Sequence, residues 1–162
     1  MSEPKQLRQP IEPTHLIGST GTEPGSELGY FSADLLTKGA FSLSVNEENP
    51  ITANLFFDSV VTSDIDFDGA WRIMSDAQGS LELDIQVSDF GQEPSSVDSI
   101  LDGNFITLSD ANVATGDMTG WLETGIDKNK IVRIVVVSSN ETITGFTLVV
   151  DTKRRMALES SS

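Results

Sequence analysis

Apolar and polar residues alternate with a period of two over much of the chain. The clearest stretch is 80–88, where Leu81, Leu83, Ile85 and Val87 share one face and polar residues occupy the other. Successive side chains of a β-strand point to opposite faces, so this pattern predicts a strand with one buried face and one face in water. Such strands are typical of antiparallel sheets.

Shorter stretches of the same kind follow one another, separated by polar turn residues. We expect further strands over 41–45, 53–61, 65–67, 71–74, 105–108 and 119–123. A turn over 75–79 is predicted to separate two of them, and the connection 89–104 to hold a short helical turn at 95–101. The last two strands, 130–137 and 142–151, are predicted to form a hairpin.

Eight or nine short strands, with no helix longer than about two turns, predict an all-β fold. The favoured architecture is a two-sheet antiparallel sandwich, jelly-roll-like, preceded by an extended N-terminal arm. Four of the six prolines lie before residue 38. We therefore divide the chain into a proline-containing arm or linker (1–37), a sandwich domain (38–153) and a polar tail (154–162).

The acidity of the chain lies mainly in the predicted sandwich. The net charge is −15, and residues 39–127 hold seventeen Asp and Glu against a single base, Arg72. Such a surface repels nucleic acid and anionic membranes, so neither is expected as a partner. A solvated surface is the simplest explanation, and a divalent-cation site or a basic partner are the alternatives.

Residues suited to catalysis are scarce. The chain has no cysteine, which excludes disulfides, thiolate metal sites and thiol nucleophiles. Its one histidine, His15, lies in the arm, whereas a catalytic base must be held rigidly by the fold. No phosphate-binding glycine motif is present. We therefore predict a protein that is not an enzyme, with no catalytic residues, no cofactor and no metal.

One acidic motif resembles the start of an EF-hand calcium loop. Asp64, Asp66, Asp68 and Gly69 occupy the first, third, fifth and sixth positions. The twelfth position, which requires a bidentate glutamate, is Ser75. The preferred interpretation is a strand with an outward row of aspartates, and adventitious calcium binding at the three aspartates is the alternative.

Aromatic side chains could form a platform on which sugar rings stack, and the candidates are Trp71, Trp121 and Tyr30. Trp71 lies within an apolar stretch, which favours packing in the core. Trp121 is also predicted to belong to the core, with the sugar platform as the alternative.

The stretch 130–137 is apolar on both faces of the predicted strand. Val132, Ile134 and Val136 form one face, so Ile131, Val135 and Val137 also need cover. A subunit interface around a cyclic axis or a roof formed by the arm or a long loop would each provide it. We favour the interface.

Several segments follow one another in a characteristic order. A Trp-containing strand leads through a small turn into an alternating strand at 69–85, and a proline-containing loop follows at 91–100. The strand Met-Thr-Gly-Trp at 118–121 and valine-rich strands over 131–150 complete the order. This order resembles β-sandwich appendage domains of tailed-phage virion proteins, of the tail-fibre or capsid-decoration type, and the similarity extends over roughly 53–153.

This resemblance implies a non-enzymatic virion structural protein, commonly trimeric, that binds other capsid or tail proteins. The arm would anchor it through Leu16, Ile17, Tyr30 and Phe31. The alternative function is a host-surface glycan-binding, or receptor-binding, module. The start of the chain lacks the apolar core of a secretory signal, so we expect assembly into the virion in the host cytoplasm.

Overall fold

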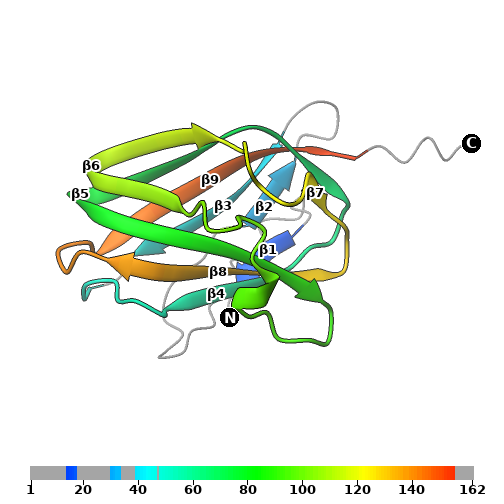
Figure 1. Ribbon diagram of the computed structural model, residues 1–162, viewed down its shortest axis with the longest axis horizontal. Coiled ribbons are helices and arrows are strands. Elements are labelled where there is room, and N and C mark those ends of the chain that lie inside the picture. The colour runs from blue at the N-terminus through cyan, green and yellow to red at the C-terminus, as the bar shows by residue number, and fades with distance from the viewer. Residues whose placement is uncertain (1–13, 18–29, 34–38, 47, 156–162) are drawn as a thin grey trace, which may run out of the picture.

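A computed structural model describes residues 14–17, 30–33, 39–46 and 48–155 (Figure 1). In these ranges the chain forms strands and one short 3-10 helix, η2 (Ser96–Asp98), which lies within the helical turn predicted at 95–101. None of the described residues belongs to a helix with the length and apolar character needed to cross a membrane. The strands are β1 (Thr14–Ile17), β2 (Tyr30–Ala33), β3 (Gly39–Asn46), β4 (Phe56–Val60), β5 (Ile65–Asp89), β6 (Ile106–Asp117), β7 (Gly125–Ile126), β8 (Lys130–Ser139) and β9 (Gly145–Arg154).

The strands form one antiparallel sheet that curls until it closes on itself. Their order is β6-β5-β8-β4-β1-β2-β3-β9, and a further pairing between β5 and β9 closes the ring. The first half of β5 lies in one layer beside β9, and its second half lies in the other layer beside β8 (Figure 1). The prediction of an all-β antiparallel, jelly-roll-like sandwich is confirmed.

The core lies between the two layers and is built from the alternating residues of the strands. Leu43 and Val45 of β3 are buried, as the pattern at 41–45 predicts. The same alternation buries one face of β4, β5, β8 and β9. Since each strand contributes only every second side chain, two layers are needed to remove these apolar faces from water.

The predicted turn at 75–79 is wrong, because β5 continues through it as one strand of 25 residues. The pairing of β5 with β6 shifts register between Met74 and Gly79 and again between Gly79 and Leu81. Irregularities of this kind bend a strand without ending it. The small polar residues that suggested a turn mark the place where β5 passes from one layer to the other.

The predicted hairpin of the last two strands is also wrong. β8 pairs with β4 and the second half of β5, whereas β9 pairs with β3 and the first half of β5. Residues 140–144 therefore cross from one layer to the other. Ile143 in this connection is fully buried, and its carbonyl accepts a hydrogen bond of 2.6 Å from the backbone N–H of Ile51. The connection therefore packs into the core through the Ile143 side chain and does not form the tight turn of a hairpin.

The strand predicted at 119–123 is absent, because Trp121 lies in a turn closed by a hydrogen bond of 3.1 Å from its N–H to the carbonyl of Met118. The preceding strand is longer than predicted, since β6 runs to Asp117. Trp71 and Gly116 are opposite each other in the β5–β6 register. A Cβ atom at Gly116 would lie 2.6 Å from the Trp71 ring, so glycine lets the ring lie against β6.

The last part of the polar face of β5 is buried, contrary to the prediction for 80–88, although Ser80 is exposed as predicted. Asp84, Gln86 and Ser88 are exposed by only 4%, 6% and 6%. The connection after β5 folds back over them: Ser99 Oγ donates to Asp84 Oδ1 at 2.6 Å, and Ser88 Oγ donates to the carbonyl of Gln92 at 2.7 Å. Hydrogen bonds to the covering loop replace the water that this face would otherwise bind.

Candidate functional site

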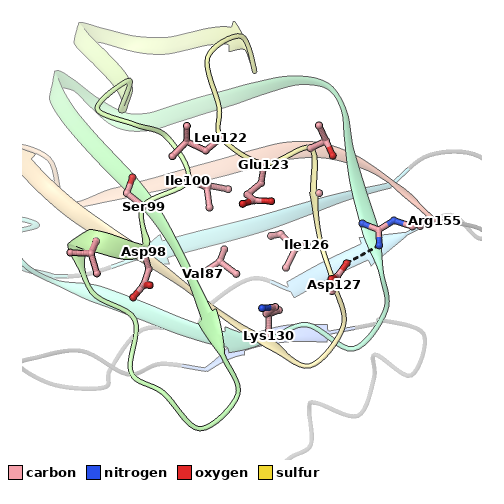
Figure 2. A pocket seen from close by; sticks show the side chains of 13 residues that line it. Val87, Asp98, Ser99, Ile100, Leu122, Glu123, Ile126, Asp127, Lys130 and Arg155 are labelled. Atoms are coloured by element: carbon pink, nitrogen blue, oxygen red, sulfur yellow. Dashed lines mark hydrogen bonds and ion pairs between the residues drawn. The ribbon is translucent and has the colours of Figure 1, made fainter.

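A cleft of about 510 Å³ lies at one end of the sandwich, between η2, β7 and the start of β8 (Figure 2). We call it the end cleft. Four segments line it: the end of β5, the residues from η2 to Ile100, the segment 122–127 and the start of β8, with Arg155 beyond β9. Its lining residues are Val87, Val97, Asp98, Ser99, Ile100, Leu122, Glu123, Thr124, Gly125, Ile126, Asp127, Lys130 and Arg155.

Two apolar side chains join the end cleft to the core. Ile100 and Ile126 are exposed by 4% and 2%. Ile100 is fixed through its backbone, whose N–H donates to the carbonyl of Ile85 at 2.9 Å and whose carbonyl accepts from the N–H of Leu122 at 2.7 Å. The cleft therefore rests on the core, with its two loops tied to each other and to β5.

The wall that contains η2 is held by a local cap. The backbone N–H of Ser95 donates to Asp98 Oδ2 at 2.9 Å, as in the Ser-x-x-acid capping arrangement. Ser99, one residue further on, donates its hydroxyl to the buried Asp84. These contacts fix the positions at which Asp98 and Ser99 reach the cleft.

The opposite wall is held by Arg155. Its Nε donates to Asp66 Oδ1 at 2.9 Å and its Nη1 to Asp127 Oδ1 at 2.8 Å, while its backbone N–H donates to the carbonyl of Asp64 at 3.0 Å. The hydrogen bond that Arg155 donates to Asp127 and, after it, the one that it donates to Asp66 raise the pKa of Arg155. One residue therefore joins the start of β5 to the segment after β7, and the dashed line in Figure 2 marks its contact with Asp127.

Lys130 supplies the second cation of the end cleft. Its Nζ lies 2.6 Å from Asp89 Oδ1, and that hydrogen bond raises the pKa of the ammonium group. Asp127 and Glu123 raise it further through their charges. Both cations of the cleft are thus already paired with aspartates, although water still reaches them.

Two of the three aspartates in the EF-hand-like motif are engaged in protein contacts. Asp64 Oδ1 accepts the backbone N–H of Lys128 at 2.8 Å, and Asp66 is bound to Arg155. Asp68 is exposed. Across the described residues no group of three or more His, Cys, Asp or Glu side chains is arranged to hold a metal ion.

The predicted tryptophan candidates pack against the core. Trp71 and Trp121 are both half-buried there, and the ring of Trp121 meets Phe67 edge-on, with ring centres 5.0 Å apart at an angle of 86°. These contacts fix the orientation of both rings against the core. The core interpretation of both residues is the one that agrees with the structure.

Ile131, Val135 and Val137 lie on the outer face of β8, a central strand between β4 and β5, and all three are half-buried. Arg133, on the same face, is 9% exposed and donates to both carboxylate oxygens of Asp58, at 2.7 and 2.9 Å. It also donates to the carbonyl of Pro94 at 3.1 Å, so the loop after β5 covers part of this face. The loop after β5 therefore provides the expected cover at Arg133, and the subunit interface stays a prediction.

The residues predicted to anchor the arm lie in β1 and β2. Leu16 and Ile17 pair with β4 through their backbones, while Tyr30 pairs with β1, and Phe31 with β1 and β3. Their side chains lie outside the described parts of the structure, as do residues 1–13, 18–29 and 34–37 of the arm, and the anchoring role stays a prediction.

The sequence did not identify the end cleft. Its lining residues are spread over several segments between Val87 and Arg155, and none of these segments carries a ligand-binding motif. The available signal was weak: Leu122 and Val97 are apolar residues in otherwise polar loops, and they are exposed by 58% and 88%.

No protein-family model matches the sequence, and no curated protein matches it. The fold is similar to the solved structure of CpGH89CBM32-6 produced by Clostridium perfringens, at 16% identity and a TM-score of 0.41, over 85% of this chain and 92% of that one. A xylan-binding domain of family CBM 22 has 11% identity and a TM-score of 0.40, over 89% and 88%. The carbohydrate-binding module CBM36 in complex with calcium and xylotriose has 10% identity and a TM-score of 0.36, over 85% and 92%. Likenesses this distant assign neither a family nor a ligand.

Proposed function

We propose that this protein is a non-catalytic glycan-binding module and that the end cleft is its binding site. The observation that carries the proposal is the composition of the cleft: hydrogen-bonding side chains on both walls stand beside the exposed, apolar Leu122. A sugar presents hydroxyl groups at its rim and C–H groups on its ring faces. Such a ligand requires polar and apolar contacts within one small space.

The end cleft has the size and the groups for such a ligand. Its volume of about 510 Å³ lies within the range of about 300–1,000 Å³ that is usual for small-molecule sites. Thr124 offers a hydroxyl, and the carboxylate of Glu123 accepts hydrogen bonds. Leu122 offers an apolar surface that water covers in the free protein.

The absence of catalysis is part of the proposal. Hydrolysis of a glycosidic bond requires one carboxyl group that stays protonated near neutral pH, which burial in an apolar pocket normally achieves. Glu123 and Asp127 are exposed to water, and Asp98 is occupied as the cap of η2. The cleft can therefore bind a glycan without activating it.

The test is a glycan array followed by titration calorimetry with the best neutral oligosaccharide. Leu122→Ala should weaken binding about fivefold, because it removes roughly 1 kcal/mol of apolar contact from a partly covered site. Val113→Ala is the matched control, since Val113 is 54% exposed on β6, outside the end cleft. If no glycan binds, or if both substitutions leave the affinity unchanged, the proposal is wrong.

A structural role on a phage particle stays a prediction. It is compatible with glycan binding, because a glycan-binding module at the tip of a virion appendage would serve host recognition. The particle-binding role concerns the residues before β3, whereas the end cleft is formed by residues after β4. The two roles can therefore be tested separately.

A further inference from the structure

The charged groups around the end cleft are unequal in number. Three carboxylates line it and two more bind its cations, so five carboxylates stand against two cations. The carboxylates are Asp66, Asp89, Asp98, Glu123 and Asp127, and the cations are Lys130 and Arg155. The cleft therefore carries an excess of negative charge, like the chain as a whole.

Glu123 differs from the other four carboxylates. Asp66 and Asp127 hold Arg155, Asp89 holds Lys130, and Asp98 accepts the N–H of Ser95. Glu123 makes no hydrogen bond or ion pair with the described residues. Figure 2 shows its carboxylate between the two walls of the cleft, with Asp98 and Ser99 on one side and Asp127 and Arg155 on the other.

The arrangement does not fit a bare metal ion. A divalent cation requires several oxygen ligands converging on one point, and across the described chain no three acidic or histidine side chains do so. A larger ligand with one positive charge can instead place that charge at Glu123 and fill the rest of the cleft with uncharged groups.

We propose that the end cleft selects glycans that carry a free amino group, and that Glu123 recognises the protonated amine. This inference rests on the proposed glycan-binding function and names the class of sugar. The ammonium group of an amino sugar donates to the Glu123 carboxylate, while the ring packs on Leu122. An acidic sugar is disfavoured, because it would add negative charge to a cleft whose cations are already paired.

The test compares two oligosaccharides that differ by a single group in each ring. A β-1,4-linked glucosamine oligomer carries an ammonium group where the corresponding glucose oligomer carries a hydroxyl. Titration calorimetry at a pH where the amine is protonated should show an affinity about two- to fivefold higher for the glucosamine oligomer, as for a partly exposed ion pair. Raising the salt concentration should reduce this preference.

Glu123→Gln should abolish the preference and leave the affinity for the glucose oligomer unchanged. Glu141→Gln is the matched control, because it removes the same charge from an exposed position beyond the other end of β8. A preference that falls equally in both variants would reflect net charge alone and would overturn the role of Glu123.

The possible failures are distinguishable. If both oligomers bind with equal affinity to the unmodified protein, the selection of amino sugars is wrong and the glycan-binding function stands. If neither oligomer nor any glycan on the array binds, the proposed function is wrong and this inference with it.

Discussion

The two ends of the sandwich differ in how the space between the layers is closed. The end beyond Ser139 of β8 is closed by the connection 140–144, whose Ile143 is fully buried and lies against the backbone at Gly79. The end at Lys130 is open and is lined by charged and polar side chains. Both ends belong to the same two layers, so the difference between them arises from the connections at each end (Figure 1).

This difference between the two ends indicates that stability and ligand binding depend on different residues. At the closed end the apolar side chain of Ile143 belongs to the core, where the loss of each methylene group lowers the free energy of unfolding. At the open end, exposed ion pairs hold the walls, and such pairs contribute little to stability. We therefore expect substitutions at the closed end to change the free energy of unfolding, and substitutions at the open end to change ligand binding.

The largest effect should follow from emptying the closed end. Ile143→Ala should lower the free energy of unfolding by about 3 kcal/mol, because it leaves a cavity among fully buried side chains. Denaturant unfolding followed by tryptophan fluorescence measures this change. Glycan affinity, measured where the variant is still folded, should not change, and a loss of affinity in the folded variant would contradict the separation of the two ends.

A smaller effect should follow from overfilling the same end. A Cβ atom at Gly79 would lie 2.9 Å from Cδ1 of Ile143, so Gly79→Ala should cost about 1 kcal/mol of stability. Adding Ile143→Val removes that Cδ1 atom, and the double variant should lose less stability than the sum of the two single variants. Additive losses in this double-mutant cycle would mean that the two residues do not meet.

At the open end, Arg155→Gln should change stability by less than about 1 kcal/mol, because its ion pairs are partly exposed. It should still weaken glycan binding, since Asp127 loses the contact that holds its wall of the cleft. Arg72→Gln, at an exposed position on β5, is the control for the lost charge. Calorimetry on both variants would refute a positioning role for Arg155 if the affinities remained equal.

The smallest effect concerns pH. The hydrogen bond to Asp89 raises the pKa of Lys130 above its ordinary value of about 10.4, so the ion pair adds stability that is fully present below that value. This contribution is lost as the pH rises through the raised pKa. The stability difference between the unmodified protein and Lys130→Met should therefore shrink above about pH 10, and denaturant midpoints measured against pH would show a constant difference if the pair contributes nothing.

Local alternation predicted the class of fold and most of the strands. It did not predict which strands pair, because pairing depends on contacts far apart in the sequence. β8 and β9 are adjacent in the sequence and were expected to form a hairpin, yet they pair with different strands in different layers. The connection between them crosses from one layer to the other with Ile143 buried. The residues at 75–79 have the composition of a turn, but they occupy a bend within a continuous strand.

The burial of the polar face of β5 could not be predicted from local alternation either. A row of Glu82, Asp84, Gln86 and Ser88 indicates contact with water, and three of the four are buried. The covering loop makes hydrogen bonds with Asp84 and Ser88, and Gln86 donates to Asp84. The end cleft could not be predicted for a related reason. Its residues come from separate strands and loops that meet only in the folded protein, so no motif in the sequence identifies them.

The most direct test of a binding site at the open end is an NMR titration of the amide-labelled protein with the glucosamine oligomer. Binding at the end cleft predicts shifts confined to residues 97–101, 122–127 and 130, with none at 140–144. Shifts that cluster at the closed end or around Arg133, or a saturating ligand concentration that moves no amide signal, would contradict it.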